Sequence, residues 1–199
     1  MNKKHDKDKV LQTGLELFWS NGYSNVGVDE LCNKTGMTKG AFYNAFKSKE
    51  QFLLLALESY GDATVINHTA ALKAQDGERA ILSLYRLYEG MLKHQKNSNY
   101  AGCLVNNMMS ELGVINETVS KATAVEFERF ISVIEPVVKQ AQTEGDFNDM
   151  TDARSLAVLI HSTFFGVLTR IKGSRDYREG TDTMQLLIKS LSTTNQIKE

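Results

Sequence analysis

The sequence predicts an all-α protein of about nine helices, in which three short N-terminal helices precede a larger helical bundle. Apolar residues recur at spacings of three and four along most of the 199 residues, which is the period of an amphipathic helix. No stretch alternates apolar and polar residues between turn signals, as a strand would. Hydrophobic residues make up 42% of the chain, enough for the core of one medium domain or two small ones.

The composition excludes several classes of protein. The N-terminal segment MNKKHDKDK is charged and no apolar run approaches about 18 residues, so we expect no secretory signal, no membrane span and a cytoplasmic location. Two cysteines without a zinc-like spacing predict neither a disulfide framework nor a metal or cofactor site. The sequence has no nucleophile elbow, phosphate-binding glycine loop or H-E-x-x-H motif, which argues against an enzyme.

The first three expected helices form a compact pattern. Apolar spacing predicts a helix over 8–20, which Asn21 and Gly22 end. A second helix over 28–35 is closed by Gly36, where positive φ is favoured, and Thr38 caps a third helix over 38–47. Two short helices joined by a glycine-containing turn indicate a helix-turn-helix, whose second helix enters the major groove of DNA.

The helix over 38–47 has two distinct faces. At about 100° per residue, Phe42 and Phe46 fall on one arc with two alanines, while lysines, a tyrosine, an asparagine and a glycine fall on the opposite arc. Lysine and backbone donors suit phosphates, and lysine or asparagine suits base edges. The predicted DNA contacts are Thr38, Lys39, Gly40, Tyr43, Asn44, Lys47 and Lys49.

Charge distribution limits this interpretation. The net charge is −1, with +2 over residues 1–50 and −3 over the remainder. Affinity for DNA must therefore come from a local footprint of lysines, to which Lys3 and Lys4 could add a basic arm, and it should fall steeply with salt. Two alternatives stay open: a helix-turn-helix used only for packing, and a module that meets another protein through 39–47.

Residues 10–60 resemble the DNA-binding domain of the tetracycline-repressor (TetR) family. They carry its G-[FY] turn and its T-G-[VM]-[ST]-K-G, [LF]-Y-x-x-F and [KS]-K-E elements in order. Gly27 departs from the family, which usually has serine or threonine at that cap. The resemblance implies a homodimeric, ligand-responsive transcriptional repressor that binds a palindromic double-stranded operator and is released by a small-molecule effector.

A helix that begins in the capping box Ser48-Lys-Glu-Gln51 and ends near residue 74 connects this unit to the rest. We expect a DNA-binding domain over 1–48 and an effector-binding and dimerisation domain over 49–199. Further helices are expected over 78–97, 100–112, 116–144, 149–173 and 181–195, with glycine breaks that include Gly180 and a kink or restart at Pro136.

The expected helix over 149–173 has apolar residues on two faces, more than one core can cover, and the last expected helix carries an apolar stripe; packed against their symmetry mates, the two would form a four-helix dimer interface of the kind found in the TetR family. An ordinary core helix in a monomer is the alternative. The predicted interface residues are Leu159, Thr163, Gly166, Val167, Met184, Leu187 and Leu191.

The segment over 101–112 resembles the regulatory domain of one TetR branch, through G-C-L followed by N-x-x-x-E-L. Cys103 near a helix N-terminus would have its thiolate favoured, so electrophile or oxidant sensing is one hypothesis and simple packing of a small residue is the other. An apolar cavity with polar tips, to which Met91, Met108 and Phe130 could add, would bind the effector. The predicted effector residues are Tyr85, Tyr88, Cys103, Asn106, Phe127, His161 and Phe164.

Overall fold

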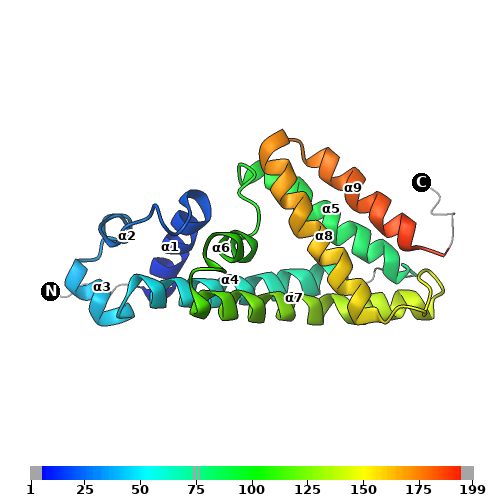
Figure 1. Cartoon of the computed structure of the whole chain (residues 1–199), viewed down its shortest axis with the longest axis horizontal. Helices are drawn as coiled ribbons and strands as arrows, with labels where there is room; N and C mark the ends of the chain where they lie inside the picture. Colours follow the sequence, from blue (N-terminus) through cyan, green and yellow to red (C-terminus); the bar gives the residue numbers. More distant parts are fainter. Residues whose placement is uncertain (1–5, 74, 76, 194–199) are drawn as a thin grey trace. The chain divides into compact units, whose positions relative to one another are not determined.

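The computed structural model describes residues 6–73, 75 and 77–193, and within them it contains nine α-helices and no β-strand (Figure 1). The prediction of an all-α fold with about nine helices is confirmed. The helices are α1 (Lys7–Asn21), α2 (Val28–Thr35), α3 (Lys39–Phe46), α4 (Lys49–Leu72), α5 (Ala80–Asn97), α6 (Leu104–Leu112), α7 (Glu117–Thr143), α8 (Ala153–Ser174) and α9 (Tyr177–Leu191). Lys3 and Lys4 lie outside the described residues.

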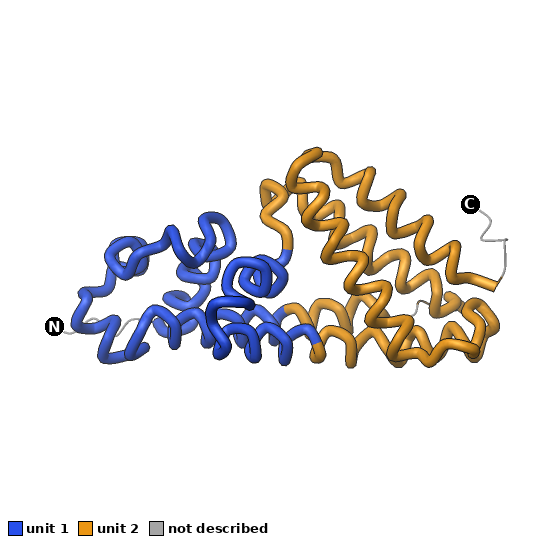
Figure 2. Tube along the Cα trace, in the orientation of Figure 1, with its two compact units in different colours: residues 1–63, 103–127 blue, residues 64–102, 128–199 orange. Residues whose placement is uncertain are grey.

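The chain divides into two compact units (Figure 2). Unit 1 comprises residues 1–63 and 103–127, and unit 2 comprises residues 64–102 and 128–199. Helices α4 and α7 each contribute residues to both units, and α6 belongs to unit 1. The residue ranges of the two units therefore differ from those of the functional domains expected over 1–48 and 49–199. The boundary between those functional domains stays a prediction.

Four phenylalanines form the core of the helix-turn-helix in unit 1. The ring of Phe52 lies 4.7 Å from that of Phe46, 5.3 Å from that of Phe42 and 6.0 Å from that of Phe18, measured between centroids. A Cβ atom on Gly14 of α1 would lie 2.1 Å from the Phe52 ring. Glycine is therefore required there for α1 to pack against α4.

The loop between α1 and α2 is held by side chains from two distant helices. Glu111 of α6 accepts hydrogen bonds from the backbone amides of Tyr23 at 3.0 Å and Ser24 at 2.7 Å. Lys49 of α4 donates to the backbone carbonyls of Tyr23 at 2.9 Å and Val26 at 3.0 Å. These four bonds fix where α2 begins.

In unit 2, α9 packs against both α5 and α8 (Figure 1). The predicted break at Gly180 is wrong, because Gly180 lies inside α9, where a Cβ atom would come within 2.9 Å of both Leu92 and Val167. That glycine permits close helix packing instead of ending a helix.

Helix α8 is long enough to cross a membrane and has a stretch with a mean hydropathy of 1.2, which would suit a membrane span. It nevertheless buries ten residues inside the unit, as the core helix of a folded domain does.

A restart at Pro136 is also wrong, because α7 runs without interruption from Glu117 to Thr143. A proline removes one intrahelical hydrogen bond. Apolar burial compensates here, since Ile131, Ile134 and Val138 on either side of Pro136 are fully buried.

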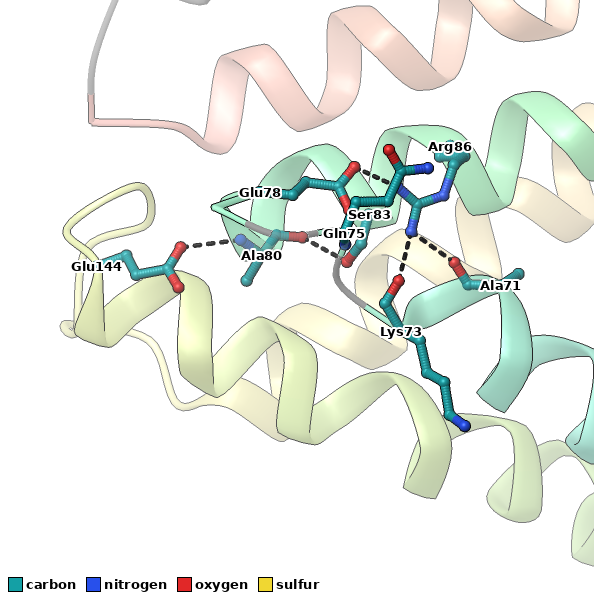
Figure 3. Close-up of polar contacts among 8 residues, drawn as sticks. All are labelled: Ala71, Lys73, Gln75, Glu78, Ala80, Ser83, Arg86 and Glu144. Atoms are coloured by element: carbon teal, nitrogen blue, oxygen red, sulfur yellow. Dashed lines mark hydrogen bonds and ion pairs between the residues drawn. The ribbon is translucent and has the colours of Figure 1, made fainter.

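Arg86 of α5 caps the C-terminal end of α4 (Figure 3). Its guanidinium donates to the backbone carbonyls of Ala71 at 2.9 Å and Lys73 at 2.8 Å, and it pairs with Glu78. The last carbonyls of a helix have no intrahelical donor, and a cation there also favours the helix dipole. The end of α4 is thus tied to α5 within unit 2.

Candidate nucleic-acid interface

Helix α3 exposes the face that the sequence predicts. Thr38 caps it by accepting a hydrogen bond from the Ala41 amide at 3.2 Å, and Phe42 and Phe46 are buried. On the opposite side Tyr43 is 47% exposed. Four further predicted residues are also exposed, namely Thr38, Lys39, Gly40 and Asn44. A Cβ atom on Gly40 would meet nothing within 4 Å, so its backbone is open to close approach by a partner.

The helix ends add backbone donors. The cap position of α2 is Gly27, which provides no side-chain hydrogen bond. The first amides of a helix lack intrahelical partners and attract anions. The N-terminal turns of α2 and α3 therefore offer donors suited to phosphate.

Lys47 is exposed, but its side chain is hydrogen-bonded to the end of α3. Its backbone has φ 66° and ψ −46°, a region that non-glycine residues seldom occupy, and its ammonium donates to the Asn44 carbonyl at 3.0 Å. The ammonium can exchange this exposed carbonyl for a phosphate, since one such bond contributes little.

Lys49 does not belong among the predicted DNA contacts. Its ammonium points inward to the two loop carbonyls and lies 3.9 Å from the centroid of the Tyr23 ring. Burial lowers the pKa of Lys49 below its usual value, partly offset by the charge of Glu111. A lysine that supports a loop in this way is a structural residue, and we no longer include it among the DNA contacts.

Three of the predicted effector residues meet in the core of unit 2. The Tyr88 hydroxyl lies 3.4 Å from Nδ1 of His161, and the Phe164 ring lies 5.2 Å from that of Tyr88 and 5.7 Å from that of His161. Burial raises the pKa of Tyr88 and lowers that of His161 to about 3, with a smaller contribution from His68. Each group is therefore neutral at physiological pH.

His68 belongs to the same cluster, although it is not among the residues predicted from the sequence. Its ring lies 5.8 Å from that of Phe130 and 6.2 Å from that of His161, and its buried Nδ1 has no hydrogen-bond partner. Burial lowers its pKa to about 4. A signal was available, because His68 lies four residues before the buried Leu72 on α4 and hence on the same helix face.

The other predicted effector residues are distributed differently. Tyr85 is half-buried in unit 2, where burial and the charge of Asp146 raise its pKa to about 12. Cys103, Asn106 and Phe127 belong to unit 1. Cys103 is the buried N-cap residue of α6, and its Sγ lies 3.5 Å from the Tyr60 hydroxyl.

The predicted dimer face also needs correction. Val167 and Met184 are buried within unit 2, where the Val167 side chain lies against Gly180 of α9, so neither side chain is exposed for contact with a second protomer. Leu159 and Gly166 are exposed, and the half-buried members of the predicted set are Thr163, Leu187 and Leu191. Leu186, which is 67% exposed, was missed.

Sequence comparisons match both parts of the chain. The family model for bacterial regulatory proteins of the tetR family matches residues 10–56, and the tetracyclin repressor-like C-terminal domain matches residues 77–187. The chain is 30% identical to the transcriptional regulator AcuR of Cereibacter sphaeroides over 171 residues, 82% of this chain and 74% of AcuR. It is 23% identical to the HTH-type transcriptional repressor NemR of Escherichia coli over 180 residues, 89% of this chain and 90% of NemR.

Solved structures share the fold. The regulatory protein TetR from Rhodobacter sphaeroides superposes with a TM-score of 0.83 at 21% identity, over 94% of this chain and 98% of that one. The reduced form of E. coli NemR gives a TM-score of 0.82 at 22% identity, over 96% and 99% of the two chains. The chain therefore belongs to the TetR family of helix-turn-helix transcriptional regulators, which are ligand-responsive DNA-binding proteins and not enzymes.

Proposed function

We propose that the protein is a homodimeric repressor that binds a palindromic operator and is released by a small-molecule effector. Each protomer would place Lys39, Gly40, Tyr43 and Asn44 of α3 in a major groove. Thr38, Lys47 and the first amides of α2 and α3 would hold phosphates. The observation that carries this proposal is the polar, exposed face of α3 opposite the buried Phe42 and Phe46.

Dimerisation would use the exposed sides of α8 and α9. Leu159 and Leu186 are large apolar side chains left exposed on these helices, and Gly166 would let backbones approach closely. Two-fold symmetry then implies two half-sites about one helical turn or more apart, roughly 34 Å.

The effector would bind in unit 2 beside Tyr88, His161 and Phe164, to which we add His68. Neutral imidazoles and a phenol among aromatic rings suit an uncharged or weakly polar small molecule. Because α4 contributes to both units, a shift of α4 would carry the response to the DNA-binding helices. Such a population shift requires that the effector bind one arrangement of α4 more tightly than the other.

Fluorescence anisotropy with a labelled mixed-sequence duplex at low salt tests DNA binding. We expect Tyr43→Ala and Lys39→Ala to weaken binding while their circular dichroism spectra and unfolding midpoints stay unchanged. Lys139→Ala, which removes an exposed lysine of α7 in unit 2, is the charge-matched control and should leave binding unchanged. Unaltered affinity in both α3 variants would instead support a packing motif or a protein-interaction surface.

A second candidate is regulation by electrophiles or oxidants at Cys103. Its position at the N-terminus of α6 and the nearby Tyr60 hydroxyl both favour a thiolate. We expect iodoacetamide or hydrogen peroxide to release wild-type protein from DNA but to leave Cys103→Ser bound. Cys32→Ser is the matched control, because Cys32 is buried like Cys103 but lies in the middle of α2, and burial and the charge of Asp29 raise the pKa of its thiol. Release of Cys103→Ser by these reagents would exclude this mode of regulation.

A cytoplasmic location without membrane association follows from the same proposal, since a bacterial regulatory protein would meet its operator in the cytoplasm. Fractionation of cells that express the protein would test it.

A further inference from the structure

An exposed ion pair joins the two helices of the helix-turn-helix. The Lys39 ammonium lies 2.7 Å from a carboxylate oxygen of Asp29, and the two side chains are 63% and 70% exposed. Asp29 lies in the first turn of α2, and Lys39 is the first residue of α3. The other proposed lysine on this surface, Lys47, is bonded to a neutral carbonyl instead.

We propose that Asp29 is a positioning residue that determines DNA specificity by holding the Lys39 ammonium in one direction. The proposal rests on the DNA-binding function proposed above. Asp29 lies beside the proposed DNA-binding surface, and its negative charge alone would repel DNA. By orienting Lys39 it would instead help to select the DNA sequence.

The chemistry of the lysine side chain supports this role. Lysine carries a compact charge with three donors on a flexible stem. Free of a partner, it can swing to whichever phosphate is nearest, and such contacts are independent of sequence. Paired with Asp29 it contributes almost no net charge, but two of its N–H donors stay available in a defined direction. Donors in a defined direction recognise acceptors such as O6 and N7 of guanine.

The interaction is suited to orienting a side chain and not to locking it. Hydrogen bonding to Asp29, followed by its charge, raises the pKa of Lys39, so the ammonium is fully charged at physiological pH. Exposed ion pairs are weak and screened by salt. The effect of Asp29 should therefore be a few-fold change in specificity.

Glu30 provides a matched control. It is the next residue of α2, also lies in the first turn, and no ion pair is found for it among the described residues. Asp29→Asn and Glu30→Gln remove the same charge from the same helix turn. The two substitutions change the net charge and the interaction with the helix dipole in the same way. Any difference in DNA binding between them therefore reports the loss of the ion pair.

The test measures affinity by anisotropy across a salt series for a mixed-sequence 30-bp duplex and for a duplex selected from a random pool. On the mixed duplex, the slope of log affinity against log salt concentration should be steeper for Asp29→Asn than for Glu30→Gln by about 0.9 per protomer, because Lys39 gains a phosphate contact. The preference for the selected duplex should fall about two- to fivefold. Asp29→Glu, which keeps a carboxylate, should stay close to wild type.

In a Lys39→Ala background, Asp29→Asn should behave as Glu30→Gln does, because no ammonium is left to reorient. Circular dichroism and unfolding midpoints establish that each variant is folded. Equal salt slopes and equal preference in Asp29→Asn and Glu30→Gln would overturn this inference while leaving the proposed function standing. Failure of wild-type protein to bind either duplex would overturn both.

Discussion

Lys47 occupies a backbone conformation that glycine tolerates better than lysine. Its φ of 66° lies outside the regions preferred by residues with a Cβ atom. We expect Lys47→Gly to raise the free energy of unfolding by up to about 1 kcal/mol, because the strain is relieved, yet to weaken DNA binding, because a phosphate contact is lost. Urea denaturation and anisotropy on the same preparations measure the two effects. Lower stability would mean that the bond to the Asn44 carbonyl outweighs the strain.

His68 makes stability depend on pH. An unfolded histidine has a pKa of about 6.5, whereas burial lowers that of His68 to about 4, so the unfolded chain binds the proton more tightly. Above about pH 6.5 the His68 side chain is neutral in both the folded and the unfolded chain, so it does not reduce stability. As the pH falls from there towards 4, only the unfolded chain gains the proton and the free energy of unfolding decreases.

Glutamine does not titrate, so His68→Gln should show a smaller loss of stability than wild type between pH 7 and 4, by roughly 2–3 kcal/mol. Denaturation with urea at several pH values measures the difference. His94→Gln, at an exposed histidine, is the control and should follow wild type. An equal loss in both variants would contradict the role of His68.

Among single residues, helical spacing alone placed Phe42, Phe46 and Tyr43 on the correct sides of α3. It could not place Lys49, because its partners Tyr23 and Val26 lie 26 and 23 residues away along the chain. Periodicity describes one helix at a time, and the direction of a long flexible side chain depends on what the other helices bring near it.

At the scale of elements, the packing of α1 on α4 depends on Gly14. A Cβ atom there would overlap the Phe52 ring, which is itself enclosed by other aromatic rings and cannot move aside. We expect Gly14→Ala to destabilise the protein by about 1–3 kcal/mol in urea denaturation.

Gly90→Ala is the control for this substitution. Gly90 also lies inside a helix, but a Cβ atom there would meet nothing within 4 Å. Alanine is the better helix former, so this variant should be as stable as wild type or more stable by up to about 1 kcal/mol. Equal behaviour of the two variants would show that Phe52 can adapt.

Capping chemistry predicts the start of α3 at Thr38, whereas apolar spacing alone placed the starts of α8 and α9 at residues 149 and 181. Thr38, Asp152 and Asp176 each accept a hydrogen bond from the first turn of their helix. Asp176 begins α9 at Tyr177, four residues before the start expected from apolar spacing. Sequence alone predicts a break at Gly180, because a packing glycine and a terminating glycine look alike until the neighbouring helices are known.

At the scale of the whole molecule, the proposed dimer depends on apolar side chains of α8 and α9. Glutamate at Leu159 and Leu186 would bury charge in the interface. We expect the double variant Leu159→Glu/Leu186→Glu to sediment as a monomer and to lose at least about a hundredfold in affinity for a two-half-site duplex. Val114→Glu, at a fully exposed apolar residue of unit 1, should stay dimeric. A dimeric double variant would place the interface elsewhere.

The predicted effector set was the part that sequence could resolve least. It joined Tyr88 and His161 of unit 2, which could line an apolar cavity, to Cys103 of unit 1, which the family resemblance places beside an effector cavity. Which faces meet is a property of tertiary packing, and periodicity contains no information about it. The family resemblance, in contrast, rested on several motifs at fixed spacing, and the comparisons confirmed it.

Selection of duplexes from a random pool by the wild-type protein, followed by sequencing, tests whether a symmetric dimer reads DNA through α3. We predict enrichment of a palindrome with two half-sites about one helical turn or more apart, and loss of that enrichment when Tyr43→Ala is used in its place. Recovery of unenriched sequences, or of a single asymmetric site unaffected by Tyr43→Ala, would contradict a dimer that reads DNA through α3.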